Sequence, residues 1–75
     1  MNIKDKELAK KFGFKVMIER KKQKLSQEEL AEKAEMHRNS IGYIERAEIS
    51  PTLDSINSIA KALGLRIQDI FDLNF

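Results

Sequence analysis

The segment LSQEELAEKA, residues 25–34, constrains the fold most because two of its side chains together mark the start of a helix. Ser26 and Glu29 have the S-x-x-E spacing of a capping box, in which each side chain accepts a hydrogen bond from the backbone N–H of the other residue. The apolar residues that follow give the segment an inner face: Leu30, Ala31 and Ala34. We therefore predict a short helix that begins directly after Ser26.

A second helical segment, MHRNSIGYIER at residues 36–46, follows after a short turn. On a helix of this register, the side chains directed to a core are Met36, Ile41 and Ile44, and those on the outer face are Arg38, Asn39, Gly42 and Tyr43. Two short helices joined by a short turn are typical of a helix-turn-helix motif.

A longer helix is predicted before this motif, from about Lys6 to Lys22. Leu8, Phe12 and Val16 recur at every fourth residue, which predicts a stripe that faces a core. The remaining large apolar residues of the segment lie off this stripe: Phe14, Met17 and Ile18.

Two more helices are predicted after the motif. Thr52 follows Pro51 and is placed to cap a helix whose first turn carries Asp54. Gly64 stands where a left-handed residue ends this helix. The core face between the two ends consists of Leu53, Ile56, Ile59, Ala60 and Leu63, and a last short helix carries Ile67, Ile70 and Phe71. With no period-2 segment in the chain, we predict an all-α fold of five helices in a single domain, residues 1–75.

Composition narrows the function classes. The 75 residues include no cysteine and one histidine, so a metal site or a disulfide framework is not expected, and no glycine-rich phosphate loop is present. We expect no enzyme activity, no cofactor, no small-molecule ligand, no membrane span and a cytoplasmic location. Residues 1–25 carry nine basic and three acidic side chains, whereas the remainder carries five basic and nine acidic ones. This charge asymmetry fits a protein that binds nucleic acid or an acidic surface. It fits equally well a lysine-rich helix that is merely exposed to solvent.

Residues 12–71 resemble the lambda-repressor-like DNA-binding domains, the Cro/cI or XRE helix-turn-helix family. Three pieces carry the resemblance in order and register: LSQEELAEKA, the I..IE pattern of the third helix, and SPTLDSINSIAKALGL. The resemblance implies a five-helix fold in which the second and third helices form the reading unit and the third lies in the major groove.

The resemblance also implies roles for individual residues. Positions that contact bases in the family are occupied by Arg38, Asn39 and Tyr43, and positions that contact phosphate by Gln27, His37, Arg46 and Arg20. Arginine bonds bidentately to guanine and asparagine to adenine. Gly42 is expected to leave space for a backbone or a duplex to approach. Arg20 and Glu45 match a family ion pair that joins the first helix to the third. The residues alone leave two alternatives open, since Tyr43 also suits a cover over the core and Gln27 a neutral surface position.

Four positions depart from the family pattern. Glu35 and Ala47 stand where the family often has glycine, and a positive φ there would strain them. His37 replaces a serine or threonine cap, and Arg66 replaces a small cap before the last helix.

Two functions of different classes follow. The first is a sequence-specific transcriptional regulator that binds double-stranded DNA, a repressor or an activator, and acts as a concentration-dependent homodimer on a palindromic operator. The second is a helical protein-interaction module, or an antitoxin-type partner, with little DNA affinity. For the homodimer we expect an interface of Ile70, Phe71, Leu73 and Phe75, supported by Phe14 and Ile18. The sequence does not choose among a phage repressor, a restriction–modification controller and an antitoxin.

Overall fold

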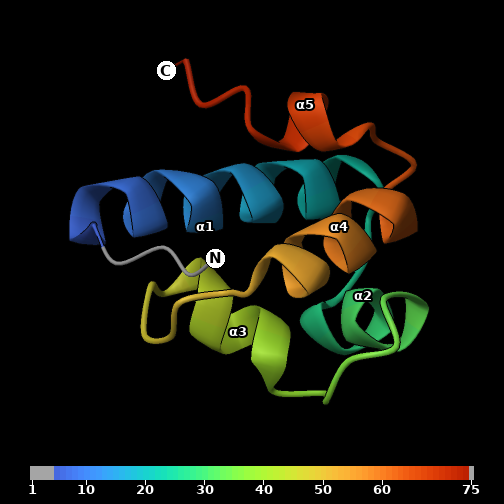
Figure 1. The fold of residues 1–75 in the computed structure, drawn as a ribbon. Coiled ribbons are helices and arrows are strands. Elements are labelled where there is room, and N and C mark those ends of the chain that lie inside the picture. Colours follow the sequence, from blue (N-terminus) through green and yellow to red (C-terminus); the bar gives the residue numbers. More distant parts are fainter. Residues whose placement is uncertain (1–4, 75) are drawn as a thin grey trace.

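The computed structural model describes residues 5–74, which form five helices (Figure 1). They are α1 (Lys6–Lys22), α2 (Gln27–Lys33), α3 (Ser40–Glu45), α4 (Leu53–Ala62) and α5 (Ile67–Ile70). In Figure 1, α1 runs across the molecule with α5 on one side of it, and α2 and α3 lie together on the other side. The predicted all-α, five-helix fold is confirmed.

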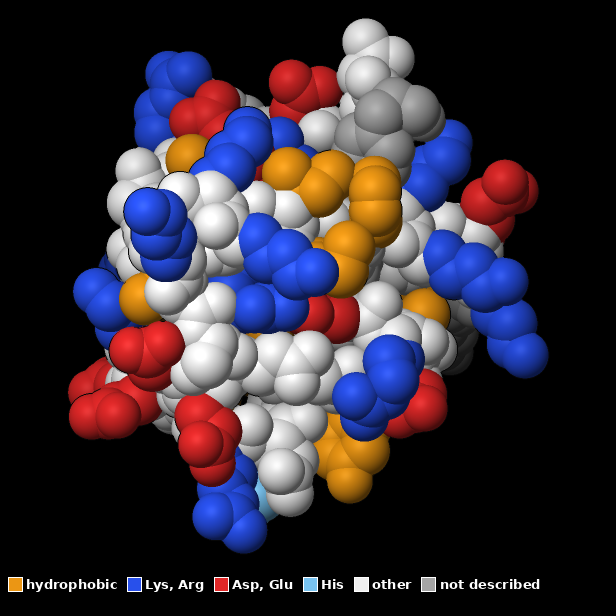
Figure 2. Space-filling view, turned by 180° about the vertical axis from the view of Figure 1, so that it is seen from behind, with side chains coloured by type: hydrophobic (Ala, Val, Ile, Leu, Met, Phe, Trp, Pro, Cys, Tyr) orange, Lys and Arg blue, Asp and Glu red, His pale blue; other side chains and the backbone are white. Residues whose placement is uncertain are grey.

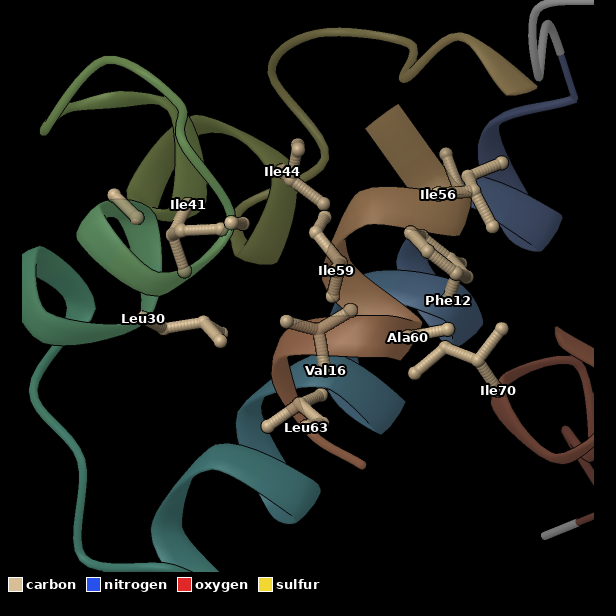
Figure 3. Packing of buried hydrophobic residues seen from close by; sticks show 13 residues of the cluster. Phe12, Val16, Leu30, Ile41, Ile44, Ile56, Ile59, Ala60, Leu63 and Ile70 are labelled. Atoms are coloured by element: carbon tan, nitrogen blue, oxygen red, sulfur yellow. The ribbon is translucent and has the colours of Figure 1, made fainter. Parts of the chain in front are cut away.

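The core draws side chains from all five helices. Figure 3 shows Phe12 of α1 among Ile56 and Ala60 of α4 and Ile70 of α5. Ile41 and Ile44 of α3 and Leu30 of α2 are also fully or almost fully buried. This core accounts for most of the apolar faces predicted from periodicity.

Two predicted core residues are on the surface instead. Leu8 is 41% exposed and Leu53 is 45% exposed. Each stands in the first turn of its helix. Ala9 takes the buried position in the first turn of α1.

The predicted starts of α1, α2 and α4 are confirmed. Ser26 Oγ accepts the Glu29 N–H at 3.0 Å, and a Glu29 carboxylate oxygen accepts the Ser26 N–H at 2.8 Å. Hydrogen bonds to the Glu29 carboxyl from the backbone N–H of Ser26 and from its side chain hold the pKa of that carboxyl below its usual range. Thr52 Oγ1 accepts the Ser55 N–H at 3.1 Å, and Asp5 caps α1 in the same way.

Helices α1 to α4 each end in a left-handed residue. Gly64 ends α4 at φ +72°, as predicted, and the Leu65 N–H bonds the Ala60 carbonyl at 2.8 Å. The left-handed residues that end α1, α2 and α3 are not glycine: Lys24 at φ 58°, Glu35 at φ 56° and Ala47 at φ 57°. The expectation that Glu35 and Ala47 carry backbone strain is therefore supported by their φ angles.

Helix α3 is shorter than predicted, because it begins at Ser40 rather than at Met36. The Met36 N–H bonds the Ala31 carbonyl at 2.8 Å and so belongs to the turn that ends α2. The Ser40 N–H bonds the His37 carbonyl at 2.9 Å, which closes a separate turn. Arg38 and Asn39 therefore precede α3 instead of lying within it.

Two further observations concern the described part of the chain. None of its helices has the length and apolar character needed to cross a membrane. In residues 5–74, no three His, Cys, Asp or Glu side chains are grouped so that they could hold a metal ion.

Candidate nucleic-acid interface

The C-terminal end of α3 is tied to α1 by a buried ion pair. Arg20 Nε lies 2.7 Å from Glu45 Oε2, and Arg20 Nη2 lies 2.9 Å from Glu45 Oε1. The two side chains are only 10% and 5% exposed. Hydrogen bonds with Glu45 and its negative charge raise the pKa of Arg20, although burial of the guanidinium acts in the opposite direction. The geometry is bidentate, which makes the pair directional as well as strong.

Arg20 also binds the loop that follows α1. Its Nη1 donates to the Leu25 carbonyl at 2.8 Å. Three of the five N–H groups of the guanidinium are thus bonded, and the expected contact of Arg20 with a phosphate stays a prediction.

Gly13 brings the backbones of α1 and α3 together at the same place. A Cβ built on Gly13 would lie 2.5 Å from the Ile44 carbonyl oxygen and 2.8 Å from that of Glu45. No side chain fits in this space, so the close approach requires glycine. The sequence analysis missed this residue, and the signal was a glycine inside a well-patterned helix.

Helix α2 joins the same junction through Gln27. Gln27 Nε2 donates to Glu45 Oε1 at 3.0 Å. Glu45 therefore accepts hydrogen bonds from both α1 and α2, which fixes the C-terminal end of α3 relative to both helices.

The N-terminal end of α3 is different, because its polar side chains face solvent. Arg38 lies 4.0 Å from Glu28, and these side chains are 74% and 71% exposed. The Asn39 N–H donates to His37 Nδ1 at 3.2 Å, and both residues are exposed. Figure 2 shows His37, the pale blue residue, at the lower edge of the molecule among basic and acidic side chains. Side chains held this loosely remain available to a partner.

Tyr43 and Arg46 lie together on the outer side of α3. The Arg46 guanidinium is 5.4 Å from the centre of the Tyr43 ring, and Arg46 Nε lies 3.1 Å from Glu48 Oε1. Tyr43 is exposed, so its ring does not act mainly as a cover over the core.

The space above Gly42 is filled by the chain itself. A Cβ built on Gly42 would lie 2.9 Å from Arg46 Nη1 and 3.1 Å from Gln27 Oε1. Gly42 is buried beneath these groups, so the expectation that it leaves open space for a duplex is wrong.

The residues predicted for the dimer interface differ in how far they are buried. Ile70 is fully buried in its own chain, which removes it from the expected interface. Phe71 is exposed at 37% although its ring lies 5.9 Å from that of Phe12, and Leu73 is half-buried. Phe75 lies outside the described residues. Phe14 is exposed and Ile18 is half-buried. Figure 2 shows hydrophobic side chains gathered in the upper part of the face that it draws.

The predicted site residues therefore fall into two groups. Gln27, Tyr43 and Arg46 meet around Gly42, and the first of them is bonded to the Arg20–Glu45 pair. The exposed turn before α3 holds the others: His37, Arg38 and Asn39.

Comparison with known proteins finds similar sequences over most of the chain. Residues 16–70 match a family model described as helix-turn-helix. The chain is 44% identical over 62 residues to the control protein C.BamHI of Bacillus amyloliquefaciens, covering 81% of this chain and 76% of that protein. It is 38% identical over 58 residues to the immunity repressor of Bacillus phage phi105, covering 77% of this chain and 40% of the repressor.

Solved structures are similar over most of the chain. The restriction-modification controller protein C.AhdI of Aeromonas hydrophila has a TM-score of 0.80 at 31% identity, covering 83% of this chain and 94% of that one. The controller protein C.Esp1396I has a TM-score of 0.81, also at 31% identity, covering 87% of this chain and 84% of that one.

Proposed function

The chain belongs to the XRE-type helix-turn-helix family of transcriptional regulators, and we propose that it acts as a homodimer on a palindromic operator in double-stranded DNA. It is a DNA-binding regulator related to restriction-modification controllers and repressors, and not an enzyme. We also propose that residues 1–75 form one functional domain.

The observation that carries the proposal is the difference in how the two ends of α3 are held. Its C-terminal end is fixed by the buried Arg20–Glu45 pair, while Arg38 and Asn39 are displayed before its N-terminus. Recognition helices present their N-terminal residues to base edges in the major groove. Arg38 would read guanine and Asn39 adenine, each contact contributing about 1–3 kcal/mol of discrimination.

Tyr43 and the residues expected to bind phosphate would add further contacts with the DNA. Tyr43 is exposed on the same helix and suits contact with a thymine methyl group or a phosphate. Gln27, His37 and Arg46 would bind phosphates, which position the protein without reading sequence. Support comes from the convergence of Gln27 and Arg46 over Gly42.

The homodimer is supported by apolar residues outside the helix-turn-helix motif that remain exposed or only partly buried. Phe71 and Phe14 are exposed, and Leu73, which follows α5, is half-buried. A two-fold dimer presents two recognition helices to half-sites about 34 Å apart, which matches a palindromic operator. We therefore propose that α5 and the C-terminal segment form the interface, supported by α1.

Binding to duplexes tests the DNA function. We expect the chain to bind a random-sequence duplex with an affinity that falls steeply as salt rises, because bound phosphates release counterions. Selection from a randomised library should yield a palindromic sequence that binds more tightly than the random duplex. Weak binding that is independent of salt would favour the protein-interaction module instead.

Sedimentation at micromolar concentration tests the dimer. We expect the wild-type chain to dimerise and Phe71→Asp to be monomeric, while Ile49→Asp, a change at an exposed apolar residue in the loop after α3, should still dimerise. A wild-type chain that stays monomeric both free and on DNA would contradict the homodimer.

A further inference from the structure

The helix-turn-helix unit carries an excess of acidic side chains, although a DNA duplex is itself negatively charged. Residues 26–48 include six acidic and three basic side chains, a formal charge of −3 with the histidine neutral. Glu45 is bonded to Arg20 of α1, but the other five acidic residues are exposed: Glu28, Glu29, Glu32, Glu35 and Glu48. Exposed carboxylates near a duplex repel its phosphates and weaken binding to every sequence. General affinity for DNA therefore does not explain them.

Two of these carboxylates lie against the two arginines of the unit. Glu28 Oε1, in the first turn of α2, is 4.0 Å from Arg38 Nη1. Glu48 Oε1 accepts a hydrogen bond from Arg46 Nε at 3.1 Å. The first pair joins α2 to the turn before α3, whereas the second joins two neighbours just after α3. Both arginines are therefore paired with an acid in the free protein.

Within residues 5–74, Glu28 is the one acidic group at ion-pair distance from Arg38. The Arg38 side chain is 74% exposed and forms no hydrogen bond in this part of the chain. A free arginine side chain loses conformational entropy when a base edge fixes it. A nearby opposite charge narrows the range of the side chain beforehand and so reduces that loss. Glu28 is placed to have this effect on Arg38.

The Arg38 guanidinium has enough donors to contact Glu28 and a base together. It carries five N–H groups, of which a bidentate contact with guanine uses two. Arg38 can therefore keep Glu28 as its partner while it reads a guanine. To reach a phosphate instead, Arg38 would have to leave Glu28, and the unpaired carboxylate would then face the DNA. Glu28 thus favours the base contact over the backbone contact.

We propose that Glu28 is a positioning residue that raises sequence specificity through Arg38. Its carboxylate orients the guanidinium towards a base edge and disfavours contact of Arg38 with the DNA backbone. The inference rests on the proposed DNA-binding function and adds to it a residue that itself touches no base. Glu48 has no such effect on specificity, because its partner Arg46 is expected on a phosphate whatever the sequence.

The experiment measures thermal unfolding and the affinity for a selected operator and a random-sequence duplex at several salt concentrations. Glu28→Gln removes the charge of the carboxylate but keeps the length of the side chain. We expect this variant to keep its Tm and to bind the random duplex more tightly, with a salt slope up to about one unit steeper, because Arg38 is free to contact a phosphate. The ratio of specific to random affinity should fall by up to about fivefold, the most that an exposed ion pair supports.

Two further variants show whether Glu28 acts through Arg38. Glu48→Gln is the matched control, since it removes the same charge beside the other arginine. It should strengthen binding to both duplexes by the same factor and leave their ratio unchanged. In an Arg38→Ala background, Glu28→Gln should also leave the ratio unchanged, because no arginine remains to be oriented.

The outcomes separate this inference from the proposed function. An unchanged ratio in Glu28→Gln would overturn the role of Glu28 alone, and so would a fall in the ratio that persists in full when Arg38 is already alanine. A lower Tm with equally weakened binding to both duplexes would also overturn it, because Glu28 would then serve only the fold. A wild-type chain that fails to bind duplex, or binds every sequence alike, would overturn the proposed function and the role of Glu28 with it.

Discussion

The two ends of α3 differ in how they are held, although only a few residues separate them. At the C-terminal end, Glu45 is almost buried and accepts hydrogen bonds from Arg20 and Gln27 at 2.7–3.0 Å. Before the N-terminal end, Arg38 is mostly exposed and lies 4.0 Å from Glu28. The helix is therefore anchored at its C-terminal end, while exposed polar side chains are presented before its N-terminal end.

The ion pairs at the two ends of α3 also differ in how strongly the stability of the fold depends on them. An exposed ion pair such as that of Arg38 and Glu28 contributes about 0–1 kcal/mol, because water competes for both charges. A buried pair contributes little net stability over an apolar replacement, but removal of one partner strands the other charge. The fold therefore depends on the anchored end far more than on the displayed end.

The largest expected effect is at the anchored end. Arg20→Ala or Glu45→Ala should lower the free energy of unfolding by about 3–5 kcal/mol, because each leaves a buried charge without its partner. Denaturant unfolding measures this loss. Glu28→Ala is the matched control at the displayed end and should change stability by less than about 0.5 kcal/mol.

A double-mutant cycle decides whether Arg20 and Glu45 act as a pair. We expect strong coupling, so that the double variant is no less stable than the worse single variant. Additive losses would show that the ion pair is not what anchors the helix.

The next effect concerns the two glycines that α1 and α3 contribute. Gly13→Ala should destabilise the protein by about 1–3 kcal/mol, since its methyl group would overlap the Ile44 and Glu45 carbonyl oxygens. Gly42→Ala meets only side-chain ends and should not destabilise. Thermal unfolding of both variants measures the contrast, and equal losses would remove the distinction between backbone contact and side-chain contact.

The smallest effect concerns the left-handed residues that flank α3. Glu35→Gly should raise the free energy of unfolding by up to about 1 kcal/mol, because glycine adopts positive φ without steric cost. Ala47→Gly removes the same strain but also loses a methyl group that packs on the core, so we expect almost no net change. Unfolding in denaturant checks both, and a loss of stability in Glu35→Gly would contradict the strain at that residue.

Much of the fold was predictable because its signals are local. The capping box of Ser26 and Glu29 and the C-terminal Gly64 each depend on neighbours within a few residues. Periodicity gave the buried side of each helix. It did not show which end of a helix its neighbours cover, and so Leu8 and Leu53 were assigned to the core incorrectly.

The start of α3 and the glycine contacts were harder to predict. The turn after α2 takes the Met36 N–H, which shortens a helix that periodicity alone would extend. Gly13 and Gly42 are both helical glycines in sequence, yet one meets backbone and the other meets side chains. Gly13 meets residues of α3, and Gly42 meets Gln27 of α2 as well as Arg46 nearby in the chain. No local pattern specifies the contacts between different helices.

The site residues came from the family resemblance, and the structure adds how they are grouped. The resemblance gave Gln27 and Arg46 as separate phosphate contacts, whereas the structure places both over Gly42. It also gave Arg20 as a phosphate contact, and the structure adds that three of its N–H groups are bonded to Glu45 and to the Leu25 carbonyl.

The most direct test of the two-ended account compares Arg38→Ala with Arg46→Ala on a selected operator and on a random duplex. We expect Arg38→Ala to reduce the ratio of specific to random affinity by about 1–3 kcal/mol for one base pair of each half-site. Arg46→Ala should leave that ratio unchanged, weaken both duplexes alike and lower the salt slope by about one. An Arg38→Ala variant that keeps the full wild-type ratio would contradict the account, because the displayed end of α3 would then not read the sequence.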